Sequence, residues 1–161
     1  MPIDRIVVNA SPIITLAKAG YADLFPELFN VVFLPRSVAR EIRAGDDAAS
    51  QLVLDAPWIT NVAVDVPADI SSWNLGDGES EVLSLALQDR GLRAAVDDRA
   101  ARRCAEAFSI RTLGTVGIVV LATRRGLIDS ARIAIDRLKA SGLYLSDELI
   151  DSVLRKEDPR T

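Results

Sequence analysis

The stretch LRAAVDDRAARR, residues 92–103, changes character in its middle, and this change indicates how the chain folds. Its first half, residues 92–96, is a short apolar run typical of a buried strand, whereas its second half begins a helical pattern of alanine and arginine. Two adjacent aspartates, Asp97 and Asp98, stand at the junction. A strand that leads directly into a helix is the repeating unit of an α/β domain, so the two carboxylates are expected where a strand of a parallel sheet ends.

The same alternation of strand and helix runs through most of the chain. Ser11 is expected to cap the first helix, with Pro12 at the first helical position and Gly20 at the end. Short strands that alternate with helices predict a three-layer α/β/α sandwich with a mostly parallel central sheet. Strands are expected at residues 5–8, 31–34, 58–64, 92–96 and 110–113, and helices at residues 11–20, 35–45, 46–56, 75–91, 97–108 and 114–126.

The length and composition predict one domain. The chain has 161 residues, of which 49% are hydrophobic, and this is enough to bury a sizeable core. No repeat, low-complexity tract or linker divides it, so residues 1–161 are expected to form a single domain. Within that domain, residues 130–161 are expected to be a C-terminal helical extension, with two polar-faced helices that add to the core or contact a partner.

The composition also excludes several classes of function. The chain contains no histidine, which removes Ser-His-Asp and Cys-His catalysis and histidine-ligated zinc. Cys104 is the single cysteine, so no internal disulfide forms, and a reducing, cytoplasmic location is expected. The longest apolar stretch, residues 117–128, is broken by two arginines and is too short to span a membrane, so no membrane partner is expected.

The net charge of −4 argues against a protein that coats nucleic acid with a basic surface, but it leaves room for a local site. Most of the basic residues are arginines, whose planar guanidinium group suits phosphate. Several of these arginines cluster along the chain, and such clusters are also typical of solvated helix faces.

Polar residues are expected to gather at the carboxyl ends of the strands, where parallel sheets bind ligands. Asn9 ends the first strand, and the helical residues Glu41 and Glu79 join it and the aspartate pair as candidates. Each residue also has a structural interpretation. Asp98 can cap a helix, Glu79 lies in a helical first turn, Glu41 flanks an apolar stripe, and Asn9 and Ser11 stand at a helix entry.

Carboxylates gathered at one edge of a sheet repel each other and need a cation. Mg²⁺ and Mn²⁺ prefer oxygen ligands and keep several waters beside a few carboxylates. With no histidine available, the chemistry that such a site favours is metal-assisted hydrolysis of a phosphodiester.

The sequence resembles the PIN-domain family, and most of all its prokaryotic branch related to the VapC-type toxins of toxin–antitoxin pairs. The resemblance implies an α/β/α sandwich and a ribonuclease that depends on Mg²⁺ or Mn²⁺. It extends from Arg5 to Ile128 and includes an N-x-S-P stretch near the start of the chain. Five stretches carry it in order: residues 6–20, 32–42, 75–91, 94–108 and 113–128.

The resemblance also implies the site residues. By position, the catalytic and metal-binding acids of the family fall on Asn9, Glu41, Glu79, and Asp97 or Asp98. Ser11 matches the small hydroxyl residue beside the first acid, and Thr115 matches a turn near the same strand ends. RNA contacts are expected from these two residues and, because arginine suits phosphate, from Arg36 and Arg102 near the carboxyl end of the sheet. Asn9 departs from the family pattern, because most nucleolytic PIN domains have aspartate there. An amide oxygen carries no charge, so the site is expected to hold its metal more weakly.

Two functions are therefore predicted as alternatives. The first is a metal-dependent endoribonuclease acting as the toxin of a toxin–antitoxin pair, and the second is a catalytically weak PIN-like module that binds RNA or a protein partner. The expected partners are an RNA substrate, a cognate antitoxin protein and a second copy of the chain in a homodimer. A receiver or phosphotransfer domain is disfavoured, because its acidic pair would follow the first strand, where this chain reads NASP.

Overall fold

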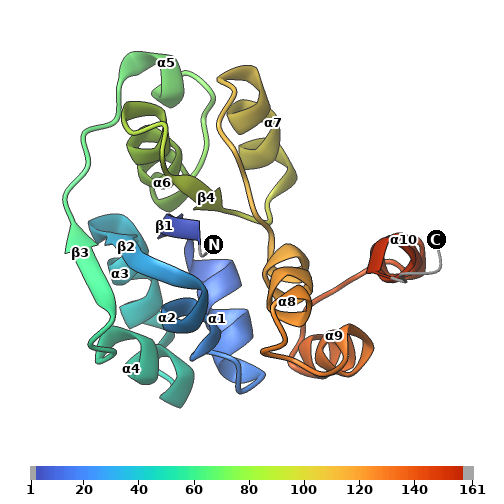
Figure 1. Cartoon of the computed structure of the whole chain (residues 1–161). Helices are drawn as coiled ribbons and strands as arrows, with labels where there is room; N and C mark the ends of the chain where they lie inside the picture. Colours follow the sequence, from blue (N-terminus) through green and yellow to red (C-terminus); the bar gives the residue numbers. More distant parts are fainter. Residues whose placement is uncertain (1–2, 158–161) are drawn as a thin grey trace.

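Within residues 3–157, which the computed structural model describes, four strands form one parallel sheet (Figure 1). The sheet order is β3-β2-β1-β4, and every neighbouring pair is parallel. The predicted α/β fold with a parallel central sheet is therefore confirmed. The strands are β1 (Ile3–Val8), β2 (Phe29–Pro35), β3 (Ile59–Val62) and β4 (Arg93–Ala95).

β1 is central in the sheet and its described side chains supply much of the core. Ile6, Val7 and Val8 are all fully buried, which means that both faces of the strand are covered. This is the pattern expected of a parallel strand between two helical layers. Val7 lies opposite Phe33 of β2 on one side and Ala94 of β4 on the other.

The prediction of a full strand at residues 110–113 is wrong. A single parallel bridge joins Thr112 to Ala94 at this place. The Ala94 N–H donates to the Arg111 carbonyl, and the Leu113 N–H donates to the Ala94 carbonyl, each at 2.9 Å. Successive residues of a strand direct their backbone groups to opposite edges, so the three-residue β4 presents only Ala94 to this segment. The contact therefore remains a single bridge.

Two groups of helices cover the sheet, as Figure 1 shows. One group packs together on one side and consists of α1 (Ala10–Lys18), α3 (Arg36–Gly45) and α4 (Ala48–Leu54). The other group contains α5 (Ala68–Ser71), α6 (Asp77–Gln88) and α7 (Arg99–Ala107). α3 also contacts α6. The sequence did not predict α5 or the short α2 (Leu24–Leu28).

The start of α1 differs from the prediction. Ser11 does not cap this helix, because α1 begins at Ala10 and Asn9 occupies the N-cap position. The backbone of Asn9 is still extended, and its N–H donates to the Ala95 carbonyl at 3.0 Å, so the sheet continues up to the helix. Ser11 therefore lies inside the first turn, where its side chain is exposed.

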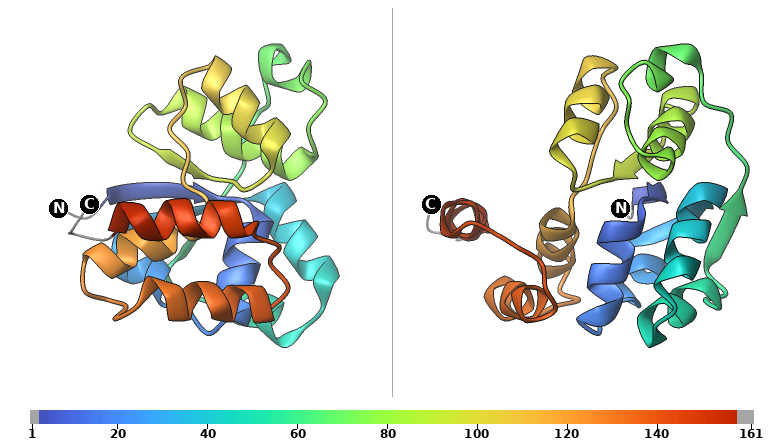
Figure 2. Two further views of the ribbon diagram at one scale, coloured as in Figure 1. Left: turned by 90° about the vertical axis from the view of Figure 1, so that its right-hand side faces the viewer. Right: turned by 180° about the vertical axis from the view of Figure 1, so that it is seen from behind.

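The two helices predicted after residue 130 are present as α9 (Ala131–Ala140) and α10 (Asp147–Glu157). α9 packs on α8 (Thr115–Arg124), and α10 contacts both. Figure 2 shows them at the end of the molecule opposite β3. Residues 158–161 of the predicted extension lie outside the described residues. None of the helices described between residues 3 and 157 has the length and apolar character needed to cross a membrane.

Candidate functional site

The strand order places a switch point between β1 and β4. From β1 the chain builds β2 and β3 on one side and then returns to place β4 on the other. In open α/β sheets, ligands bind outside the carboxyl ends of the strands at such a point. Asn9 follows β1, and Asp97 and Asp98 follow β4 shortly after Ala95, so the sequence brings its candidate residues to this edge.

One group of candidates surrounds Gly78 in the first turn of α6. A Cβ atom placed on Gly78 would lie 3.1 Å from Asn9 Oδ1 and 3.2 Å from Glu41 Oε2. Asn9 Nδ2 donates to Glu79 Oε1 at 3.3 Å. Three parts of the fold thus converge here, because Asn9 joins β1 to α1, Glu41 comes from α3 and Glu79 comes from α6. We call Asn9, Glu41, Gly78 and Glu79 the Gly78 cluster.

The Asn9 side chain has one satisfied atom and one unsatisfied atom. Asn9 is only 4% exposed, and its Oδ1 is buried without a hydrogen-bond partner among the described residues. Because a carboxylate can only accept, the amide must present Nδ2 to Glu79, and this fixes Oδ1 on the other side. A buried acceptor with no donor is costly, so the oxygen is available to a cation or a water.

The carboxylates of the Gly78 cluster influence each other. The pKa of Glu41 is raised above its usual 4.5, first because its carboxylate is partly removed from water and then because of the negative charge of Glu79. Glu41 is exposed as a whole residue, so this effect concerns the end of the side chain that faces Gly78. No ion pair within the described part of the chain neutralises these two carboxylates.

Gly78 was not predicted as a site residue. A side chain at this position would also lie 3.3 Å from Val38 Cγ2, so the absence of a Cβ keeps the space between the oxygens open. The GDG sequence at residues 76–78, just before the helical glutamates, was the available signal.

A second group of candidates surrounds Gly114, at the start of α8. Asp97 accepts from the backbone N–H of Thr115 at 2.8 Å and also from the Thr115 hydroxyl. Thr115 is fully buried, so these two bonds tie the end of β4 to the N-terminus of α8. A Cβ on Gly114 would lie 3.0 Å from both Asp97 Oδ1 and Arg102 Nη1. We call Asp97, Arg102, Gly114 and Thr115 the Gly114 cluster.

The structure gives Asp98 the helix-capping role, while its predicted metal-binding role stays a prediction. Its carboxylate accepts from the Ala101 N–H at 2.9 Å and caps α7. The sequence alone could not separate Asp97 from Asp98, whereas the structure gives them different partners. Asp97 faces the Gly114 cluster, and Asp98 is exposed at the helix start.

The structure divides the predicted set of acids between these places. Among the described residues, no three Asp, Glu, Cys or His side chains gather closely enough to hold a metal ion. The Gly78 cluster nevertheless fits a hard divalent cation, because the free Oδ1 of Asn9 lies beside two carboxylates and all the donors are oxygens. Two carboxylates and an amide make a sparse ligand set, in which water would fill the remaining positions.

Arg36 lies on a different hollow from Arg102. A cleft of about 600 Å³ between α3, α6 and the segment after β3 is lined by Arg36, Arg40 and the buried Glu81. Burial raises the pKa of Glu81, while the Ser37 N–H and the nearby Arg40 partly offset this. Glu81 was not among the predicted site residues. Ser11, predicted as an RNA contact, is exposed on α1, and the prediction stays open.

The structure thus describes an α/β domain with acids and a buried amide at the switch point of a parallel sheet. The chain belongs to the PIN domain family DUF3368, whose match covers residues 5–158. PIN domains are typically metal-dependent nucleases and generally use divalent cations.

The fold is also similar to a solved structure. The structure of the PIN domain endonuclease Utp24 superposes with a TM-score of 0.52 and 11% sequence identity. The match covers 68% of this chain and 84% of that chain, and at this identity it shows the fold alone. A search of curated proteins finds no match to the sequence.

Proposed function

We propose that the protein is a metal-dependent endoribonuclease that hydrolyses RNA phosphodiesters. The observation that supports this most is the unpartnered Asn9 Oδ1, which lies in the Gly78 cluster beside Glu41 and Glu79. A domain that only needed a stable helix entry would not leave a buried acceptor unpaired next to two repelling carboxylates. Membership of a PIN family supplies the reaction class.

The residues divide the work of such a site. Asn9, Glu41 and Glu79 would hold Mg²⁺ or Mn²⁺, and the chemistry that the cation supplies is neutralisation of the charge that develops on the phosphate oxygens. The hydrogen bond from Asn9 Nδ2 to Glu79 orients the amide so that Oδ1 lies on the side of Gly78. Asp97 holds the start of α8 through Thr115, so it positions the opposite wall of the site. Arg36 and Arg102 would bind phosphates of the RNA backbone.

We further propose that the protein acts in the cytoplasm as the toxin of a VapC-type pair, with a small antitoxin as its partner and a homodimer as its assembly. The support is the resemblance of residues 5–128 to that branch. If this is right, expression of the chain alone arrests growth, and a small protein encoded beside it restores growth. Growth that continues at full rate would argue against the toxin role.

A catalytically weak binding module is the second candidate function. Two features favour it: Asn9 is neutral where most active PIN domains have an acid, and the described acids do not form a group of three. Such a protein would bind RNA or a protein partner without cutting RNA.

An RNA cleavage assay on the full chain separates the two functions. We expect cleavage with Mn²⁺ or Mg²⁺ and none with a chelator. Glu79→Gln removes a charge of the Gly78 cluster and is expected to lower the rate at least tenfold, since it also weakens the positioning of Asn9. Glu27→Gln, on the exposed face of α2, is the matched control and should cleave like the parent. RNA binding without cleavage under all metal conditions would support the binding module instead.

A further inference from the structure

A groove runs from the Gly114 cluster toward the C-terminal helices. Two adjoining hollows, of about 560 Å³ and 550 Å³, lie along the start of α7. The second hollow continues past the start of α8 to the segment at residues 143–146, which joins α9 to α10 and includes Tyr144. We call the two hollows together the α7 groove. Four residues line both of them: Asp97, Arg99, Arg102 and Thr112.

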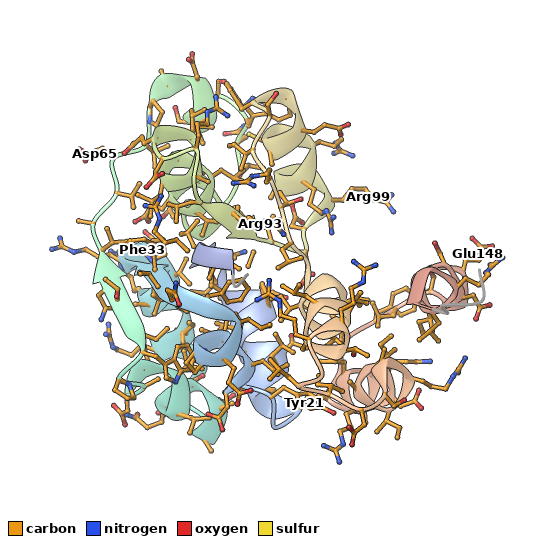
Figure 3. All side chains as sticks on the ribbon, viewed as in Figure 1. Tyr21, Phe33, Asp65, Arg93, Arg99 and Glu148 are labelled. Carbon is orange, nitrogen blue, oxygen red and sulfur yellow. The ribbon has the colours of Figure 1, made fainter. Side chains whose placement is uncertain are left out.

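The arginines of the α7 groove are free to bind an anion. Arg99 and Arg102 are exposed, and neither guanidinium group donates a hydrogen bond or forms an ion pair with the described part of the chain. In Figure 3, Arg99 projects from the start of α7 away from the body of the molecule, on the side where α10 lies. Asp97, the acid that lines both hollows, already accepts two hydrogen bonds from Thr115. The guanidinium groups are therefore suited to phosphate.

Tyr144 adds an aromatic surface to the same groove. It is 88% exposed, the most exposed of the large hydrophobic side chains that the structure describes. A free aromatic ring beside unpaired guanidinium groups is typical of proteins that bind single-stranded nucleic acid, because the ring stacks on a base while the cations hold the backbone. Tyrosine and arginine are also common at protein interfaces. The groove reaches Asp97 at the edge of the candidate site, and this continuity favours a nucleic acid strand.

We propose that the α7 groove binds single-stranded RNA on one side of the cleavage site. Arg99 and Arg102 hold phosphates, and Tyr144 stacks on an unpaired base. Duplex RNA fits less well, because its bases are already stacked on each other and offer no free face to the ring. This inference rests on the proposed ribonuclease function and deepens it by naming a surface, outside the Gly78 cluster, that takes the RNA strand.

Binding measurements on the full chain in the presence of a chelator test the groove, since RNA then stays intact. The probes are a labelled RNA strand of about 12 nucleotides and the same strand paired with its complement, both followed by fluorescence anisotropy. We expect the single strand to bind more tightly than the duplex. Tyr144→Leu should weaken single-strand binding roughly fivefold to a hundredfold, whereas Tyr144→Phe, which keeps the ring, should bind like the parent.

The arginines have a separate readout in the salt dependence. Arg99→Ala and Arg102→Ala should each weaken binding and lower the slope of log affinity against log salt by about 0.7, the value for one phosphate contact on a single strand. Arg132→Ala, on the exposed face of α9, removes the same charge outside the groove and should leave the slope unchanged. Thermal melts of all variants identify any loss of folding, which exposed positions are not expected to cause.

The outcomes distinguish a failure of the proposed RNA-binding groove from a failure of the proposed nuclease function. Equal affinity of the parent, Tyr144→Leu and Arg99→Ala proteins would overturn the groove, even if the Glu79→Gln protein loses cleavage and the nuclease stands. Weakened binding by the groove variants, with no cleavage by the parent under any metal condition, would support the groove and overturn the nuclease. A parent protein that binds no single-stranded RNA would overturn the proposal that the α7 groove binds RNA. An acidic protein segment would then be the better candidate for the groove.

Discussion

The Gly78 and Gly114 clusters lie at the same edge of the sheet but have opposite electrostatic conditions. In the Gly78 cluster, Asn9 Oδ1 has no donor among the described residues, and Glu41 and Glu79 repel each other. In the Gly114 cluster, Asp97 accepts from both the backbone and the hydroxyl of Thr115. The first cluster therefore needs a cation from outside, whereas the carboxylate of the second is already satisfied by the fold.

This difference shows how an acid that serves chemistry can be told from one that also serves stability. Both kinds stand at strand ends or helix starts, so position does not separate them. The donors that reach each oxygen do separate them. Removing a carboxylate that accepts hydrogen bonds from the fold lowers the stability of the protein, whereas removing one that needs an external cation raises the stability of the metal-free protein.

Asn9→Asp should have the largest effect. The substitution replaces the Nδ2 donor to Glu79 with a third charge at a position that is only 4% exposed. We expect the free energy of unfolding of the metal-free protein to fall by roughly 2–4 kcal/mol and the Mn²⁺ affinity to rise. Urea denaturation and calorimetry measure the two quantities. Asn61→Asp, exposed on β3, is the control, and an Asn9→Asp protein that matches it in both would make Asn9 a helix-entry residue only.

Asp97→Ala should have the next largest effect and should act on stability with or without metal. It leaves the backbone N–H and hydroxyl of the buried Thr115 without their acceptor, so we expect a loss of about 2–3 kcal/mol. Asp98→Ala removes one helix cap and should cost about 1 kcal/mol. Urea denaturation decides this. If Asp97→Ala stabilises the metal-free protein, Asp97 belongs electrostatically with the Gly78 cluster and the comparison above fails.

Glu41→Gln should have the smallest effect, visible as a pH dependence. The pKa of Glu41 is raised in the folded protein above the usual 4.5, so above pH 4.5 the folded state holds its proton more tightly than the unfolded state does. The stability that this proton provides is complete below pH 4.5 and is lost as the pH rises through the folded pKa. Glu41→Gln should therefore gain stability relative to the metal-free parent across that window and keep a constant gain above it.

A series of urea denaturations at increasing pH measures this gain. Glu81 also has a raised pKa, but it is present in both proteins and cancels in the difference. A Glu41→Gln protein whose gain in stability does not change with pH would mean that the negative charges of the Gly78 cluster do not destabilise the metal-free protein.

The fold was largely predictable, because most strands and helices have a recognisable pattern of apolar residues in the local sequence. Apolar runs such as residues 5–8 and 92–96 became β1 and β4, and the helix expected at 75–91 became α6. The short helices α2 and α5 were missed, since segments of five and four residues carry too little periodicity. The strand expected at 110–113 failed for a tertiary reason, the three-residue length of β4.

The sequence could select candidate residues, but it could not predict how they are arranged. The resemblance selected Asn9, Glu41 and Glu79; in the structure Asn9 and Glu41 lie beside Gly78, and Glu79 is bonded to Asn9. The bonds from Thr115 to Asp97 join residues 18 positions apart. Such a pairing depends on how α8 meets the end of β4, and no local pattern contains this information.

The position of β1 between β2 and β4 has a consequence for the newly made protein. Val8 of β1 pairs with Ala95 of β4. The ribosome must therefore synthesise β2, β3 and the helices between them before β1 and β4 can pair. Such distant pairings form late, because the chain must first be brought together over its whole length. A nascent chain up to β3 therefore has Asn9 and Glu41 but neither Glu79 nor the Asp97–Thr115 wall. Any function that needs both clusters is therefore delayed until synthesis has passed the start of α8.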